Sequence, residues 1–342
     1  MAELKDQISL SETSSSDGSF AAPWTRALFA LIFVFLIGMI FNAGGAFFQW
    51  GTHRDMLRQI SVIGILACGM TLVIITAGID LSVGSVLGLN AVLFALLSLR
   101  LDWPAYLAVG ACLGAGVACG ALSGVVIARF KMQPFIATLA MMVFARGLAK
   151  SISGGEKVSR AVLRPDGSYA YVDLPRLFRA IDHRVFGGNV AVVTLIFLGC
   201  ILLCWVLLAR LRWGRYLYAV GANEEAARLS GVPTGRMKLL AYSVCGAFAA
   251  IAGICQAIQE QQGDPEAGTG YELSAIAVVV IGGTSLTGGR GSIAFTLLGT
   301  LTIGYLEKIL SINAVSEASR LILTGVIIVA AVLLQRKTAQ QG

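Results

Sequence analysis

Long runs without a charged residue constrain this chain more than any other feature. Five of them approach or exceed the roughly 20 residues that an α-helix needs to cross a bilayer core: 59–79, 81–99, 103–128, 185–209 and 239–259. Hydrophobic residues make up 56% of the chain and charged residues 13%, whereas soluble domains carry about 25% charged residues. A soluble core does not explain so little charge. The sequence therefore predicts an all-α fold, a polytopic helical bundle in a membrane.

Shorter apolar runs at the two ends of the chain raise the expected number of transmembrane helices to about ten. The expected segments are 25–42, 60–78, 82–99, 103–128, 134–152, 188–208, 239–258, 272–283, 292–310 and 320–335. The polar, serine-rich stretch 1–24 does not resemble a secretory signal, so we expect a disordered cytoplasmic tail there. We expect residues 25–338 to form one transmembrane domain.

The basic residues predict the orientation, because cytoplasmic loops carry an excess of Lys and Arg. With the N-terminus inside, the inside connections contain Arg129, Lys131, Arg210, Arg212, Arg215, Arg228, Arg236, Lys238, Arg290, Arg336 and Lys337. The outside connection 260–272 has four acidic residues and no basic one. The extracytoplasmic loop 153–187 is basic, but long loops follow the rule poorly. We therefore expect both termini inside, and we attribute the net charge of +7 to topology and not to nucleic-acid binding.

Small residues recur at every fourth position of segment 103–128. Gly110 and Gly114, and then Gly116, Gly120 and Gly124, have the small-xxx-small spacing that lets helices approach closely in lipid. The seven cysteines all lie in apolar runs, and we interpret them as packing residues and not as metal ligands.

The stretch "TAGIDLSVGS", residues 76–85, places polar groups between two apolar runs. An ionisable side chain at membrane depth usually faces the protein interior or a water-filled cavity. Gly78 and Gly84 flank Asp80 and Ser82, and glycine lets the backbone break without Cβ strain. Two interpretations remain open and are compatible. Asp80 caps the next helix at a tight turn, or these residues contact the transported solute.

A second stretch, "GGTSLTGGRGS" at 282–292, repeats the pattern of the first. Both contain G-x-x-L-[ST]-x-G. The first copy runs from Gly78 to Gly84, and the second runs from Gly283 to Gly289 and includes Thr287. Paired glycine-rich interruptions in two halves of a transporter indicate the translocation machinery. The spacing is also similar to a nucleotide-binding loop, but Gly289 replaces the phosphate-binding lysine and no strand precedes it. We therefore exclude ATP binding by this chain.

Other charged residues in apolar segments allow simpler interpretations. Arg146 either extends to the outer interface or lines a polar path. Glu307 and Lys308 are expected to mark the end of their helix. Asp80 is the one clear carboxylate for a proton-coupled pathway, so the energy for transport is expected to come from another subunit.

The inside loop 209–238 is too polar to enter the membrane. Its part 223–230 predicts a short helix, with Asn223 as N-cap and Glu224 and Glu225 favourable in the first turn. Gly231 then ends the helix. Such a helix is typical of a docking element, and the alternative is a solvated connecting loop.

The same helix carries a motif of a known family. Glu225, Ala226, Ala227 and Gly231 match the EAA-x-x-x-G core of membrane subunits of ABC importers, although the hydrophobic-x-Leu-Pro part of that motif is absent at "LLAYSV". Four stretches, "GMTLVIITAGIDLSVGS", "QPFIATLAMM", "GRYLYAVGANEEAARLSGV" and "AGTGYELSAIAVVVIGGTSLTGGRGSI", resemble the ribose-type permease family over about residues 55–335.

The resemblance implies partners that the residues alone do not indicate. It implies a homo- or heterodimer of permease subunits in the bacterial inner membrane, a partner ATP-binding subunit that hydrolyses ATP, and a periplasmic sugar-binding protein. It implies no cofactor in this chain and no enzymatic activity of its own. It assigns coupling to the ATPase to Glu225, Ala226, Ala227 and Gly231. It suggests a pathway or gating role for Asp80, Ser82 and Gly84, and we add Arg146, Thr287 and Gly289 as pathway candidates from their own positions. The stretch with Asp264, Glu266 and Tyr271 is a candidate docking or gate surface.

The preferred function is ATP-driven import of a monosaccharide or polyol by alternating access. A secondary carrier or channel for small polar solutes is the first alternative. A membrane enzyme such as a lipid-linked transferase is the second, but it requires clustered acids or histidines at a membrane surface. The sequence does not specify the sugar.

Overall fold

The computed structural model describes residues 23–163, 168–316, 318–320, 322–323 and 325–326. Within this part, nine of the ten expected segments are helical. Their bounds are α2 Pro23–Ile40, α3 Trp50–Ile75, α4 Val83–Ala95, α5 Ala105–Phe130, α6 Pro134–Ser153, α8 Val192–Trp205, α11 Thr234–Glu260, α12 Tyr271–Ile281 and α13 Ile293–Ile312. The expected tail 1–24 and segment 320–335 lie largely outside the described residues.

Seven of the described helices are long and apolar enough to cross a membrane: α3 to α6, α8, α11 and α13. The π-helical turns Leu96–Arg100 and Val206–Arg210 lengthen α4 and α8. The helix α12 has 11 residues, and at 1.5 Å per residue it covers about half of a 30 Å hydrocarbon core. The segment 272–283, expected to span the membrane, is therefore a half-length helix.

The connection after α6 is folded and not a simple loop. It contains α7 Arg176–Ile181 and short antiparallel strands: β1 Val158–Ser159, β2 Ala161–Leu163, β3 Tyr169–Tyr171, β4 Arg184–Val185 and β5 Val190–Ala191. Strand β2 pairs with β3 and β4 with β5, while β1 pairs with β6, Gln262–Gly263, from beyond α11. The β1–β6 pairing ties residues 262 and 263 to the connection that follows α6.

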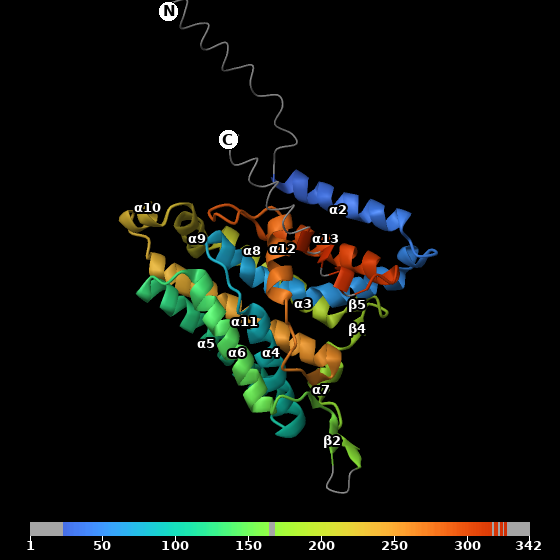
Figure 1. The fold of residues 1–342 in the computed structure, drawn as a ribbon. Coiled ribbons are helices and arrows are strands. Elements are labelled where there is room, and N and C mark those ends of the chain that lie inside the picture. The colour runs from blue at the N-terminus through green and yellow to red at the C-terminus, as the bar shows by residue number, and fades with distance from the viewer. Residues whose placement is uncertain (1–22, 164–167, 317, 321, 324, 327–342) are drawn as a thin grey trace, which may run out of the picture.

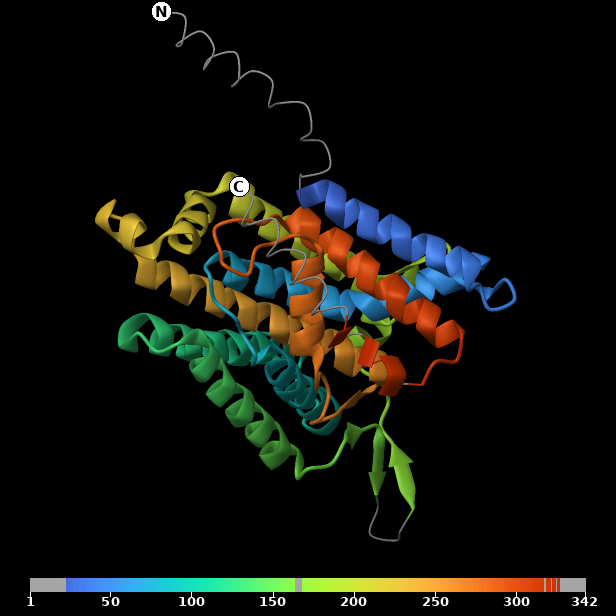
Figure 2. The same ribbon diagram turned by 45° about the horizontal axis from the view of Figure 1, so that its top comes forward.

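The connections gather at two opposite ends of the bundle (Figures 1 and 2). The α10 end comprises 131–133, 282–292 and residues 211–233, which include α9 Arg212–Ala222 and α10 Glu224–Leu229. The hairpin end comprises 41–49, 101–104, 154–191 and 261–270. Contacts across the chain hold the hairpin end together, such as the 2.8 Å hydrogen bond from Trp50 Nε1 to Asn189 Oδ1.

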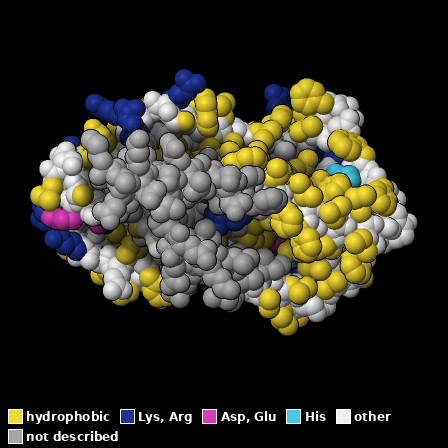
Figure 3. Space-filling model, turned by 90° about the horizontal axis from the view of Figure 1, so that it is seen from above, with side chains coloured by type: hydrophobic (Ala, Val, Ile, Leu, Met, Phe, Trp, Pro, Cys, Tyr) yellow, Lys and Arg dark blue, Asp and Glu magenta, His cyan; other side chains and the backbone are white. Residues whose placement is uncertain are grey.

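Helices α3, α4 and α11 form the centre of the bundle. The apolar window of α3 is 89% buried, whereas that of α6 is 28% buried. Helix α11 packs along α5, α3 and α4. Exposed apolar side chains cover the outer helices, and Figure 3 shows them gathered on the face that carries α2. This arrangement suits a bundle whose outer surface is covered by lipid.

The glycine pattern of α5 was predicted correctly for one half of the helix. Positions 116, 120 and 124 pack closely against the backbone of α11, where a Cβ would overlap Gly246, Tyr242 or Leu239. Gly110 and Gly114 face open space instead, so their assignment to close helix packing is wrong within this chain. All seven cysteines are free and buried, as expected for packing residues.

Candidate functional site

Helix α10 forms where the capping residues predict it. The Asn223 side chain accepts a hydrogen bond of 2.9 Å from the amide of Ala226, which satisfies one of the free amides of the first turn. Glu224 and Glu225 occupy that turn, where carboxylates favour the helix dipole. Gly231 follows with φ +82°, a left-handed conformation that glycine adopts without steric cost. The expected start and end of this helix are confirmed.

The motif residues of α10 divide between its two faces. Ala227 is buried against the bundle, whereas Glu225 and Ala226 are exposed. The Arg228 guanidinium bonds to the Glu225 carboxylate at 2.5 Å and lowers the pKa of that carboxyl. Leu229 is 76% exposed. Helix α10 therefore offers a small charged and apolar surface at the end of the molecule.

Helix α9 was not predicted, because the whole region 209–238 was interpreted as a polar loop. Its buried residues Gly214, Leu217, Val220 and Gly221 recur at helical spacing, and this periodicity could have revealed the helix. The Tyr218 hydroxyl donates a 2.9 Å hydrogen bond to the carbonyl of Gly291. Helix α9 thus joins α10 to the second glycine-rich stretch.

The two glycine-rich stretches meet at the α10 end. The amide of Gly289 donates a 2.9 Å hydrogen bond to the carbonyl of Ile75, and Gly288 packs against Ala77. Gly221 of α9 fits between them: a Cβ there would overlap the Ile75 carbonyl and approach the Gly289 amide. The backbone of α9 is therefore in direct contact with both breaks.

Asp80 makes a tight turn, but it does not cap α4 in the expected way. Its Oδ1 accepts hydrogen bonds from the amide and the hydroxyl of Ser82, at 2.9 and 2.6 Å. Helix α4 starts at Val83, so Ser82 is itself the N-cap, and it makes no side-chain capping bond. The carboxylate therefore stabilises the turn before the helix and not the amides of its first turn. Asp80 is 1% exposed, so contact with a solute requires a rearrangement.

The other expected pathway residues are placed differently. Thr287 is exposed on the second stretch, where its hydroxyl bonds to that of Ser285 at 2.7 Å. Gly84 lies on α4 and packs against the carbonyl of Gly268 in the segment 261–270. The second stretch thus packs on Ile75 and Ala77, next to the turn of Asp80 and Ser82 in the sequence, while Gly84 contacts the segment 261–270.

Arg146 bonds to the main chain of the segment 261–270. It is half-buried, and its Nη1 donates to the carbonyls of Pro265 and Ala267, the latter at 2.9 Å. Two further cations of the same region bind this segment: Lys150 pairs with Glu266 at 2.5 Å and Lys157 with Asp264 at 2.9 Å. We call Arg146, Lys150, Lys157 and their partners in 264–267 the basic clamp.

The basic clamp changes the interpretation of the acidic segment as a docking surface. Burial alone would raise the pKa of Asp264, but the hydrogen bonds from Lys157 and from the Glu266 amide, together with the charges of Lys157 and Arg146, lower it. Asp264 and Glu266 are already paired within the chain. Tyr271 is the first residue of α12. A docking partner would therefore have to compete with these internal ion pairs.

Glu307 and Lys308 do not mark a helix end, because α13 continues to Ile312. Both line a cavity between α3 and α13.

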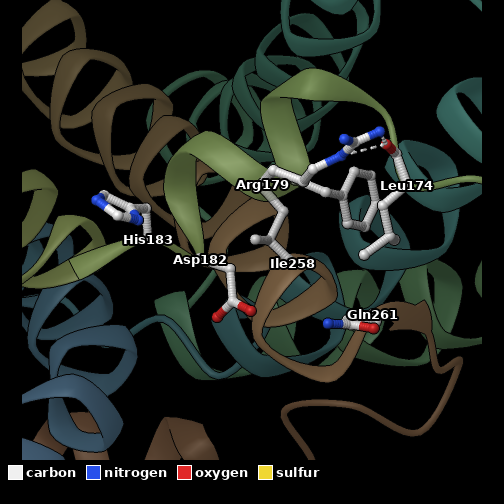
Figure 4. Close-up of a pocket in the computed structure, with 7 residues that line it drawn as sticks. Leu174, Arg179, Asp182, His183, Ile258 and Gln261 are labelled. Carbon is white, nitrogen blue, oxygen red and sulfur yellow. Dashed lines mark hydrogen bonds between the residues drawn. The ribbon is translucent and has the colours of Figure 1, made fainter.

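A second cavity, of about 270 Å³, lies beside α7. Figure 4 shows its Arg179 turned to the carbonyl of Leu174 and its His183 turned away to the opposite side. The polar side chains that line this cavity do not point toward a common position inside it, so it is not a formed binding site.

The described residues contain no group of three or more His, Cys, Asp or Glu side chains that could hold a metal ion.

Residues 53–332 match a family described as branched-chain amino acid transport system / permease component. The chain belongs to this permease family. No solved structure matches the permease significantly.

Named relatives resemble the permease over most of its length. It is 38% identical to the ribose import permease protein RbsC of Escherichia coli (strain K12) over 329 residues, 95% of this chain and 98% of the relative. It is 36% identical to the fructose import permease protein FrcC of Rhizobium meliloti, covering 86% and 80%. It is 33% identical to the xylose transport system permease protein XylH of Escherichia coli (strain K12), covering 92% of each. The permease is a multi-pass membrane protein and a transport component.

Proposed function

We propose that this permease is the membrane subunit of an ATP-driven ABC importer that carries a monosaccharide or related polyol from periplasm to cytoplasm by alternating access. Three relatives are named as a ribose import permease, a fructose import permease and a xylose transport system permease. The observation that carries the proposal is the continuous contact from α10 through α9 to both glycine-rich breaks. Such a contact lets a partner at α10 move the centre of the bundle.

The α10 end faces the cytoplasm in this proposal. It carries the basic connections that the positive-inside rule assigns to the inside: Lys131, Arg212, Arg215, Arg228 and Arg290. The first helix then starts inside, and both termini are cytoplasmic in a ten-helix protein of the bacterial inner membrane. The hairpin end, with its folded connection 154–191, faces the periplasm.

The ATP-binding subunit docks on the exposed face of α10. Glu225 and Leu229 provide charge and apolar surface there, and Ala227 and Gly231 fix the helix against the bundle. When ATP closes the partner cassettes, α10 moves with them. Helix α9 transmits the displacement to Gly289 and Ile75, and so to the turn that holds Asp80.

Two further partners complete the importer. A second permease subunit, identical or paralogous, pairs with this one, and a soluble periplasmic binding protein delivers the sugar at the hairpin end. The binding protein sets much of the specificity, so the transmembrane pathway needs few tight contacts. No nucleotide is bound by this chain itself.

The test is to purify the permease from its native host in mild detergent and to identify the proteins that accompany it. An ATPase with Walker motifs should co-purify, and Glu225→Lys combined with Gly231→Val should remove it and abolish ATP-dependent uptake. Arg176→Glu, a charge reversal on exposed α7 at the opposite end, is the control and should retain the ATPase.

A secondary carrier or channel is the alternative. It is favoured if the permease purifies alone and moves ribose, xylose or fructose into liposomes without ATP. The docking role of α10 is then wrong.

A further inference from the structure

A polar cavity lies between two spanning helices near the hairpin end. Its volume is about 70 Å³, and it is lined on α3 by Gln59 and on α13 by Glu307, Lys308 and Ser311. Arg320, from the chain beyond α13, forms another wall and interacts electrostatically with Glu307. Gln59 and Glu307 are well inside their helices, nine residues after the start of α3 and five before the end of α13.

Two more helices bring polar groups to the same place. Tyr271, at the start of α12, lies near Gln256, near Glu260 at the end of α11 and within electrostatic range of Glu307. Gln256 in turn donates a 2.5 Å hydrogen bond to Glu260. Polar side chains from α3, α11, α12 and α13 therefore gather at one depth of the bundle.

Such a cluster needs a reason, because polar and ionisable groups within a membrane protein are costly and usually mark a substrate pathway. Simple packing does not require it: apolar residues of similar volume would fill the space at lower cost. Carboxylates accept hydrogen bonds, while amides and hydroxyls both donate and accept them. Lys308 and Arg320 also line the cavity and add hydrogen-bond donors. This mixture of donors and acceptors matches the hydroxyl groups of a polyhydroxylated solute and not a purely apolar one.

We propose that Gln59, Glu307 and Ser311, with Gln256, Glu260 and Tyr271 beside them, form a polar subsite that holds one hydroxyl-bearing edge of a polyhydroxylated solute. The proposal rests on the proposed function, since it assumes that solute passes through this chain. The cavity has room for about two water molecules. In this conformation it therefore accommodates hydroxyl groups and not a whole sugar ring.

The first test uses the complete transporter, reconstituted in liposomes with its ATPase and binding protein. The probe is whichever of ribose, xylose and fructose the wild-type complex imports. Glu307→Leu and Gln59→Leu should each lower uptake at least tenfold while ATP hydrolysis stays within twofold, so that fewer solute molecules cross per ATP. Glu307→Gln, which keeps hydrogen bonding, should retain more uptake than Glu307→Leu.

Thr302→Val on α13 is the matched control. Its hydroxyl is buried and bonds within its own helix to the carbonyl of Leu298 at 2.8 Å, outside the cavity. It should change neither uptake nor the number of solute molecules per ATP. A merely structural role of Glu307 would lower uptake and ATP hydrolysis together as the protein lost stability, and this result would overturn the proposal.

The second test does not depend on transport. Ser311 and Ser319 are both exposed, but only Ser311 lies on the cavity wall, so Ser311→Cys places a thiol there and Ser319→Cys places one outside it. The imported sugar should slow modification of the first thiol, but not the second, by a charged methanethiosulfonate reagent. Equal modification of Ser311→Cys with and without sugar contradicts the subsite. A wild-type complex that imports no sugar would refute the proposed function instead.

Discussion

The two ends of the permease are held together by different kinds of contact. At the α10 end, main chain packs on main chain: Gly289 donates to Ile75, and Gly221 leaves no room for a side chain. At the hairpin end, the segment 261–270 also makes main-chain contacts, in the β1–β6 pair and where Gly268 packs on Gly84. There, however, the basic clamp adds contacts through long, flexible side chains. Its ion pairs are partly exposed to solvent.

This difference predicts that the α10 end transmits a displacement, while the hairpin end adjusts by exchanging ion pairs. Backbone contacts without free volume transmit a displacement because packed interiors do not yield gradually. Exposed ion pairs are worth about 0–1 kcal/mol each, so they break and form again at little cost. We therefore expect the α10 end to move as a unit with its neighbours, and the hairpin end to open by exchanging side-chain partners.

The largest effect is expected from Gly221→Ala. The new methyl group would overlap the Ile75 carbonyl, and overpacking of this kind costs about 1–3 kcal/mol. Because the contact carries the proposed coupling, uptake should fall more than tenfold. Thermal unfolding and sugar uptake measure the two effects. Gly199→Ala on α8, which faces open space, is the control and should be neutral or slightly stabilising.

A second large effect is expected from Arg146→Ala, because Arg146 is the most buried cation of the basic clamp. Its guanidinium bonds to two carbonyls, and a charged hydrogen bond contributes about 1.5–3 kcal/mol. The variant should lower the unfolding temperature and increase proteolysis within residues 261–270. Arg100→Ala removes one exposed bond, to Ala161 at 3.3 Å, and should have little effect. Equal effects of the two variants would contradict the role of the clamp.

The sequence predicts the local elements well, because their causes are local. Apolar runs, most of them free of charge, identify nine helices of the described part. Asn223 and Gly231 bound α10 to within one residue. Helix α9 was missed because Arg212 and Arg215 dominate the composition of a segment whose buried face is narrow. Capping residues and apolar runs therefore locate a helix even where the segments that pack against it are unknown.

Long-range contacts explain what the sequence does not predict. The pairing of Gly289 with Ile75 and the fit of Gly221 against both depend on the packing of distant segments. The acidic segment was interpreted as a free surface because Lys150 and Lys157 lie more than 100 residues away in the chain. Nothing in the local composition indicates which distant cation neutralises an acid.

A moderate effect is expected at the cap of α10. Asn223→Ala removes the bond to the Ala226 amide, and loss of an N-cap costs about 1 kcal/mol. Because α10 is short, this loss should weaken the binding of the ATPase and reduce uptake severalfold, with little change in global unfolding. Asn223→Asp keeps a capping oxygen and should behave like the wild type. If both substitutions reduce uptake equally, loss of the capping hydrogen bond does not cause the lower uptake.

The smallest effect is expected from the exposed pair of the basic clamp. Lys150 and Glu266 are 51% and 57% exposed, so Lys150→Glu or Glu266→Lys should each change the free energy of unfolding by less than about 1 kcal/mol. The double exchange should restore most of the loss, and the recovery should shrink in high salt because solvent ions screen exposed charges. A double-mutant cycle measures the coupling. Coupling well above 1 kcal/mol would mean that this end is as rigid as the α10 end, and the contrast between transmission and adjustment would fail.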